Sequence, residues 1–261
     1  MTTLVTFNVN SLKMRLPVVL DILNNQRPDV LMIQEVKGMD IPEMELKSTG
    51  YYIAAKTQKA YNGVLTATRN PQSCVIDVLP GMEEDEQARF ISVTMNNTTY
   101  INIYAPNGNP IGTEKYTYKR KWLDALYTHL SDLRARRMNV VVAGDFNIIP
   151  RPLDAAHPEK WTGDALFQQE IRDLYRAILA LGYTDTLRAH MGEDTKDIYT
   201  FWDYQAGAWA RNDGIRIDHI LASPVPAQKL TEAGVDTGPR GRESPSDHTP
   251  TYAIFNNDSV I

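Results

Sequence analysis

Short apolar runs recur along the chain, and turn-forming pairs such as Asn62–Gly63 and Asn107–Gly108 separate them. Runs of this kind, rich in β-branched and aliphatic residues and bounded by turns, are typical of buried strands. They predict strands at Leu4–Asn8, Val30–Glu35, Tyr51–Ala54, Gly63–Thr68, Val75–Leu79, Phe90–Met95, Tyr100–Tyr104, Val140–Asp145, Ile215–Leu221 and Thr251–Phe255.

Longer segments place apolar residues at the spacing of a helix. They predict helices at Leu16–Asn25, Thr113–Arg137 and Leu166–Leu181. In the second of these, one buried stripe is formed by Tyr116, Trp122, Leu123, Leu126, Leu130 and Leu133. Many strands with few helices favour an α/β fold, in which two mixed β-sheets pack face to face and helices cover both outer faces, a four-layer αββα sandwich.

Polar side chains stand at the ends of several predicted strands. They are Asn8, Glu35, Tyr104, Asp145 with Asn147, and Asp247 with His248. Taken singly, each is more often a turn, a cap or a solvated residue. Gathered at one rim of a sheet, however, such groups suit a divalent cation and phosphate oxygens. Together they predict a metal-dependent phosphodiesterase, and their spread from residue 8 to residue 248 predicts a single domain over residues 1–261.

Asp218 differs from these residues because it lies inside an apolar run. An unpaired carboxylate is costly to bury, so Asp218 requires a histidine or a metal as its partner. His219 follows directly, but alternation along a strand would point it to the opposite face. The sequence therefore predicts a partner for Asp218 other than its neighbour.

The composition changes this picture only slightly. A net charge of −5 gives no support for nucleic-acid binding through overall charge, although a bound cation would reverse the local sign at a carboxylate cluster. Basic residues gather in segments 115–137 and 211–242, which predict either solvated surfaces or a DNA-facing surface. The single cysteine, Cys74, is interpreted as a small core residue. We expect a cytoplasmic protein, with neither a signal-like N-terminus nor a membrane span.

The polar residues lie in segments that, in this order, resemble the exonuclease III family of DNA-repair nucleases in its bacterial form. This family belongs to the endonuclease/exonuclease/phosphatase superfamily, which shares the DNase I fold. The matching segments are Thr6–Leu12, Gln34–Lys37, Ile103–Gly108, Gly144–Asn147, Tyr199–Tyr204, Arg216–Asp218 and Ser246–His248. The Gly-Asp-Phe-Asn and Ser-Asp-His segments mark only the superfamily, whereas the Tyr-Ala-Pro-Asn-Gly, Phe-Trp-Asp-Tyr and Arg-Ile-Asp segments narrow the resemblance to the exonuclease III branch.

The resemblance implies a role for each matching position. Glu35 resembles the principal magnesium ligand, with Asn10, Asp247 and His248 also at or near the metal, and manganese is a possible substitute. Some relatives have Asp at the position of Asn10, so an amide here implies a lower metal affinity. Asp145 resembles the group that orients or deprotonates the attacking water, and Asn8 resembles its hydrogen-bonding neighbour.

The remaining roles concern phosphate and sugar. Tyr104, Asn107 and Asn147 resemble contacts to phosphate oxygens. His248 resembles the group that stabilises charge on the pentavalent phosphorus, held in one tautomer by Asp218. The substrate-facing region implied by the resemblance also includes Phe201, Trp202, Ile215 and Ile217.

The implied activity is hydrolysis of phosphodiesters in duplex DNA, from 3′ ends and on the 5′ side of abasic sites, with no obligate protein partner. Two alternatives stay open from the residues alone. One is a relative that acts on another phosphodiester or on a phosphomonoester. The other is a catalytically silent nucleic-acid-binding protein on the same fold, which would have lost Glu35, Asp145 or His248, and all three are present.

Overall fold

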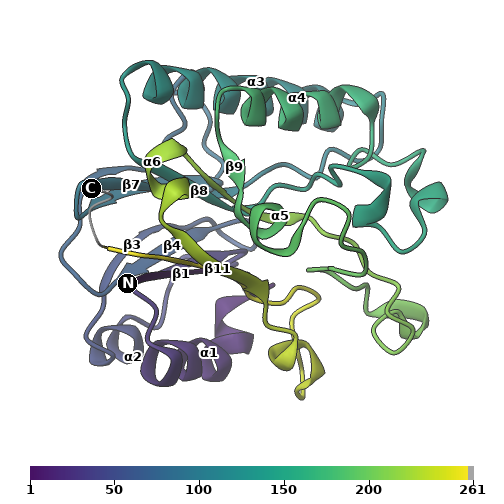
Figure 1. Ribbon diagram of the computed structural model, residues 1–261. Helices are drawn as coiled ribbons and strands as arrows, with labels where there is room; N and C mark the ends of the chain where they lie inside the picture. Colours follow the sequence, from purple (N-terminus) through teal and green to yellow (C-terminus); the bar gives the residue numbers. More distant parts are fainter. Residues whose placement is uncertain (258–261) are drawn as a thin grey trace.

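The structure, a computed structural model, describes residues 1–257 and has four layers (Figure 1). Helices α3 (Glu114–Ala135) and α4 (Gln169–Ala180) lie along one outer face, α1 (Leu12–Asp21) and α2 (Glu43–Ser48) lie along the other, and two β-sheets are stacked between them. The predicted αββα sandwich is therefore confirmed.

Each sheet has six strands among the described residues and combines one parallel pair with antiparallel neighbours. The first sheet contains, in spatial order, β11 (Leu230–Val235), β12 (Thr251–Phe255), β1 (Thr2–Asn8), β2 (Val30–Gln34), β4 (Val64–Thr68) and β3 (Tyr52–Lys56). The second contains β5 (Ser73–Ile76), β6 (Phe90–Met95), β7 (Thr98–Tyr104), β8 (Val140–Asp145), β10 (Asp218–Ala222) and β9 (Thr184–Asp185). Short helical segments complete the chain: a π-helical turn at Ile22–Gln26, α5 (Thr186–Met191), α6 (Pro224–Gln228), and 3₁₀ turns at 152–154, 158–161, 205–207 and 238–241.

Three apolar cores hold the layers together, and side-chain alternation along the strands assigns residues to them. Val140 and Val142 of β8 pack toward α3 and α4 with Trp122, whereas Val141 faces the first sheet. Val19 of α1 packs on the outer face of the first sheet. A strand buried on both faces is apolar throughout, which explains the continuous valine run before Asp145. In the described part of the chain, no helix combines the length and apolar character needed to cross a membrane.

Several predicted details were wrong at the edges of the fold. Cys74, predicted in the core, is exposed on the edge strand β5. Strand β11 was missed because an edge strand tolerates polar residues, which obscure the apolar pattern. The first helix begins earlier, at Leu12, and continues into the π-helical turn. The strand predicted at Ile215–Leu221 begins only at Asp218, and Ile215 instead makes isolated bridges to Ala155 and Phe201.

A buried ion network stands beside the start of β10. The guanidinium of Arg216 contacts Asp154 at 2.6 Å and Asp185 at 2.8 Å, and all three side chains are buried. Arg188 also donates to Asp154, and the hydroxyl of Tyr175 donates to Asp185. Burial alone would raise the pKa of Asp185, but the charge of Arg216 outweighs it and lowers the pKa to about 2. The network fixes the segment that leads directly into Ile217 and Asp218.

Replacing Arg216 by methionine is expected to lower the free energy of unfolding by about 3–5 kcal/mol, because it leaves Asp185 as an unpaired buried charge. Urea unfolding followed by circular dichroism measures this loss. The matched control is Arg176→Met, which removes an exposed ion pair with Asp173 on α4. That change should lower the free energy of unfolding by less than about 1 kcal/mol. Equal costs for the two variants would contradict the prediction.

Candidate active site

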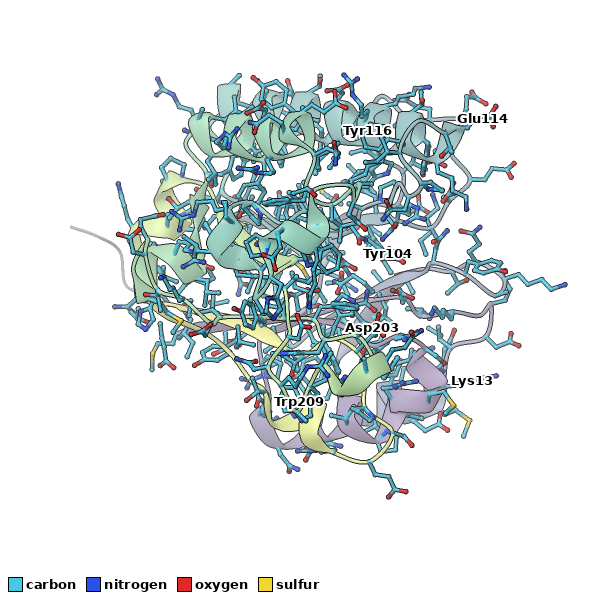
Figure 2. The ribbon with its side chains drawn as sticks, turned by 90° about the vertical axis from the view of Figure 1, so that its right-hand side faces the viewer. Lys13, Tyr104, Glu114, Tyr116, Asp203 and Trp209 are labelled. Carbon is cyan, nitrogen blue, oxygen red and sulfur yellow. The ribbon has the colours of Figure 1, made fainter. Side chains whose placement is uncertain are left out.

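The polar residues at the strand ends meet at one rim of the sandwich because the strand registers align them. Asn8 pairs with Gln34, the residue before Glu35, in the first sheet. In the second sheet Asp145 pairs with both Tyr104 and Asp218. Figure 2 looks toward this end of the molecule, where Tyr104 lies between the upper layers and the segment that carries Asp203 and Trp209. The two sheets therefore each contribute part of one cluster.

The centre of the cluster is a buried Asp–His–Asp arrangement. The Nδ1 atom of His248 lies 2.8 Å from Oδ2 of Asp218, and its Nε2 atom lies 3.8 Å from Oδ2 of Asp145. Burial alone would lower the pKa of His248, but the Asp218 carboxylate outweighs it and raises the pKa to about 10. Burial raises the pKa of Asp145 to about 7, and the charge of His248 opposes this rise. The geometry therefore pairs a cationic imidazole with a carboxylate that can exchange a proton near neutral pH.

Asn8 joins this arrangement to Glu35. Its side-chain amide donates to Oε1 of Glu35 and to Oδ2 of Asp145, each at 2.9 Å. The other oxygen of Glu35 lies 2.7 Å from the ammonium of Lys37. Burial opposes ionisation of Glu35, but Lys37 outweighs this effect and lowers the pKa of Glu35. Glu35 is thus held as a carboxylate at the edge of the cluster.

The oxygen atoms around Lys37 fit a hard divalent cation. Its ammonium is bound by Glu35 and also by the side-chain oxygen of Asn10, and the Asn10 amide donates to Asp247 at 3.0 Å. A lysine charge therefore stands where carboxylate and amide oxygens converge, and such oxygens are the ligands that magnesium prefers. One ligand atom from each of Glu35, Asp145 and His248 also lies within 4.8 Å of the others. His248 contacts Asp218 through Nδ1, so the atom that it offers to this group is Nε2, which faces Asp145.

Tyr104, Asn107 and Asn147 surround the same space with hydrogen-bond donors. Burial, together with the nearby carboxylates of Glu35 and Asp145, raises the pKa of Tyr104 well above its ordinary value. Its phenol therefore keeps its proton and can donate. The Asn107 amide lies 3.4 Å from the side-chain oxygen of Asn147. These groups can donate to the oxygens of a bound phosphate.

Local backbone strain sets the direction of several of these side chains. Glu35 and Asn147 have φ angles of 55° and 50°, in the left-handed region that side-chain-bearing residues rarely adopt. Strain of this kind persists where the surrounding structure fixes it, often at functional sites. Gly144 has a related role, because a Cβ atom there would lie 2.0 Å from the carbonyl oxygen of Ile103. The glycine before Asp145 therefore lets β7 and β8 approach.

The Phe-Trp-Asp-Tyr segment supports the histidine loop through its backbone. The Trp202 amide donates to the carbonyl of Asp247 at 2.9 Å, and Phe201 forms a bridge with His248. The rings of Phe201 and His248 meet edge to face at 5.0 Å. Trp202 itself is buried, and its indole N–H donates to Asn212. Trp202, predicted to bind substrate, thus has no exposed face in this conformation and acts through packing.

A cavity of about 340 Å³ lies beside the cluster, and its lining includes Phe201, Ile215, Trp161 and Asp164. Ile217, also predicted to face the substrate, is absent from this lining, although both isoleucines are buried and belong to the same apolar core. The two isoleucines therefore differ: Ile215 is shared between core and cavity, and Ile217 belongs to the core.

Two basic residues near the site were not singled out from the sequence. The guanidinium of Arg89 lies 4.7 Å from the ring centre of Tyr104. Lys119, interpreted as part of a basic helix surface, is instead fully buried. A lysine in the apolar stripe of a helix was the available signal, since Lys119 falls one turn before Leu123.

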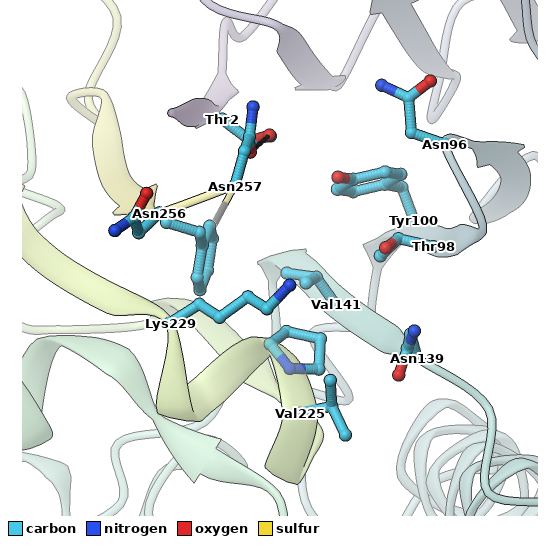
Figure 3. A pocket seen from close by; sticks show the side chains of 12 residues that line it. Thr2, Asn96, Thr98, Tyr100, Asn139, Val141, Val225, Lys229, Asn256 and Asn257 are labelled. Carbon is cyan, nitrogen blue, oxygen red and sulfur yellow. Dashed lines mark hydrogen bonds between the residues drawn. The ribbon is translucent and has the colours of Figure 1, made fainter. Parts of the chain in front are cut away.

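A second cavity, of about 310 Å³, lies away from the cluster, where β1 and β8 begin (Figure 3). Its lining includes Lys229, Tyr100, Asn139 and Val141. Because the polar cluster stands at the opposite ends of β1 and β8, this cavity is separate from the candidate site.

The fold and the cluster define a hydrolase of phosphate esters. Comparison with known proteins narrows the class. Residues 5–248 match the model of the endonuclease/exonuclease/phosphatase family, and the chain belongs to this family. It is 30% identical to exodeoxyribonuclease III from Haemophilus influenzae, over 96% of this chain and 98% of that protein.

Solved structures agree with this assignment. The chain is 36% identical to a 3′ phosphatase from Neisseria bound to a product DNA hairpin, with a TM-score of 0.94 over 98% of this chain and all of that chain. It is 37% identical to an AP endonuclease from Archaeoglobus fulgidus, with a TM-score of 0.93 and the same coverage. Relatives with different named activities thus share the fold almost completely.

Proposed function

We propose that the protein is a magnesium-dependent DNA-repair nuclease that acts in the cytoplasm on duplex DNA, both at 3′ ends and on the 5′ side of abasic sites. The observation that carries the proposal is the contact of His248 with Asp218 on one side, while Asp145 and Asn8 stand on the other. A silent DNA-binding protein would have no use for a buried histidine flanked by two carboxylates, which is costly to maintain.

In the proposed reaction a water molecule attacks the phosphorus and the bond from phosphorus to the 3′ oxygen breaks. Asp145 accepts a proton from this water, assisted by its raised pKa. The His248 cation donates a hydrogen bond to an oxygen on which charge develops, and Asp218 holds the ring in place. Tyr104 and Asn147 donate to the other phosphate oxygens.

Glu35, Asn10 and Asp247 are the residues proposed to hold the metal, with Lys37 moving aside. When bound, magnesium supplies positive charge that polarises the phosphate and favours the departing oxygen. The amide of Asn8 donates to Oε1 of Glu35 and to Oδ2 of Asp145 and so ties the two carboxylates together, while Oε2 of Glu35 contacts Lys37.

The experiment that tests the proposal uses three labelled duplexes, with a recessed 3′ hydroxyl, a 3′ phosphate and one abasic-site analogue. Each is incubated with magnesium and with a chelator. Magnesium-dependent cleavage of the first and third supports the proposal. Release of phosphate alone would support a phosphatase, the activity named for one Neisseria relative. No reaction with any duplex would reject a DNA substrate.

The discrimination between abasic and intact sites is expected to depend on Ile215. A small apolar wall suits a sugar without its base, because an attached base would need room and would leave polar edges unpaired. Ile215→Ala should relax discrimination against intact nucleotides in the abasic-site assay. Its matched control is Ile217→Ala, a change of equal size in the same core. Both should cost about 2–5 kcal/mol of stability, but only the first should alter selectivity. Equal selectivity in the two variants would show that this cavity does not determine the discrimination between abasic and intact sites.

A further inference from the structure

Lys119 is a fully buried lysine on α3, although the residues that follow it, Arg120 and Lys121, face solvent. Its ammonium donates to two main-chain carbonyl oxygens, that of Asn107 at 3.0 Å and that of Asn147 at 2.6 Å. Burying an ammonium costs several kcal/mol unless its donors are used. A lysine in this position therefore requires a specific reason.

The loop after β7 is shaped to accept this side chain. Gly108 has a φ angle of 87°, and a Cβ atom there would lie 2.5 Å from Cδ of Lys119. Any larger residue would collide with the lysine stem and would also be strained by the backbone conformation. The glycine of the Tyr-Ala-Pro-Asn-Gly segment thus leaves the space through which Lys119 reaches the loops.

The two carbonyls belong to the two asparagines whose side chains are proposed to contact phosphate. Asn107 lies in the loop after β7, and Asn147 lies in the loop after β8. Their side chains meet at 3.4 Å, and the Asn147 amide also donates to the carbonyl of Ala105 at 2.9 Å. A further link joins Asn109 of the first loop to Asp164. Among the described hydrogen bonds, Lys119 is therefore the one cation that donates to the backbones of both Asn107 and Asn147.

We propose that Lys119 is a positioning residue that fixes the backbones of Asn107 and Asn147 so that their amides meet the phosphate in register. This inference rests on the proposed nuclease function. Lys119 acts through the two asparagines and need not touch the substrate. Misplacement of a reacting or binding group by about 1 Å can cost about 100-fold in rate, so loss of this link should act mainly on the chemical step.

The test compares Lys119→Met, which keeps the stem but removes the ammonium, with Lys119→Gln, which keeps an N–H donor. The control is Lys47→Met, on the exposed surface of α2. Steady-state kinetics use the recessed 3′ duplex with saturating magnesium. We expect kcat to fall about 10- to 100-fold for Lys119→Met, with KM nearly unchanged, and to recover in part for Lys119→Gln. Lys47→Met should match the wild type.

A double-mutant cycle with Asn147→Ala separates positioning from a general loss of structure. If Lys119 acts through Asn147, adding Lys119→Met to Asn147→Ala should cost much less than it costs alone. Additive losses would overturn the inference, as would wild-type kcat in a folded Lys119→Met. If Lys119→Met fails to fold by circular dichroism, the cycle is run with Gly108→Ala, which displaces the same side chain. In each of these outcomes the wild type still cleaves DNA, whereas an inactive wild type would reject the proposed function and this inference with it.

Discussion

Replacing His248 by alanine is expected to slow cleavage of the recessed 3′ duplex by at least about 100- to 1,000-fold, the typical cost of removing one preorganised transition-state donor. The expected loss is this large because His248 is buried between Asp218 and Asp145, and Asp218 holds its ring at 2.8 Å. Single-turnover rates at saturating enzyme measure the chemical step and exclude a change in DNA binding as the cause.

Replacing Asp218 by asparagine tests the residue that holds His248 in place. The amide keeps the size of the side chain but removes the charge that raises the pKa of His248. We expect slower hydrolysis from a folded protein, with a smaller loss than in His248→Ala. His190→Ala, which changes an exposed histidine, is the control. Near wild-type activity in His248→Ala would show that the catalytic site has been misplaced.

The layers of this fold follow from apolar pattern alone. The valine run of β8 and the stripe of α3 both predict burial, and Trp122 of α3 lies in the same apolar core as Val140 and Val142, as expected. Which strands lie at the edges of the two sheets could not be predicted from the apolar pattern. The exposed strand β5 contains Cys74 and Val75, and nothing in their apolar character distinguishes an edge strand from a central one.

The sequence predicted which residues form the candidate site, but it did not predict how their side chains contact one another. Strand ends indicated Asn8, Glu35 and Asp145, because a polar group that follows an apolar run stands at the rim of the sheet. Their mutual contacts depend on strand order and on the positive φ of Glu35, which no local pattern contains. Lys119 shows the same limit, since its burial depends on Gly108 in a loop eleven residues earlier.

Glu35→Ala is expected to abolish nearly all turnover at low magnesium and to recover part of it at high magnesium. Removing a carboxylate ligand weakens metal binding more than it removes the rest of the catalytic groups. The structure adds a second reason for a large effect, since Glu35 is the carboxylate that holds Lys37 beside Asn10. Initial rates over a magnesium titration give the apparent affinity, and calorimetry of magnesium binding gives it without turnover.

The control for this variant is Glu43→Ala, which removes an exposed carboxylate paired with Lys47 on the surface of α2. It should leave both the rate and the magnesium titration unchanged, because a solvated surface pair contributes little. If Glu35→Ala also leaves the magnesium titration unchanged, Glu35 is not a metal ligand. The contacts of Lys37 with Glu35 and Asn10 would then only stabilise the fold. Asp145 and Asp247 would have to hold the metal without Glu35.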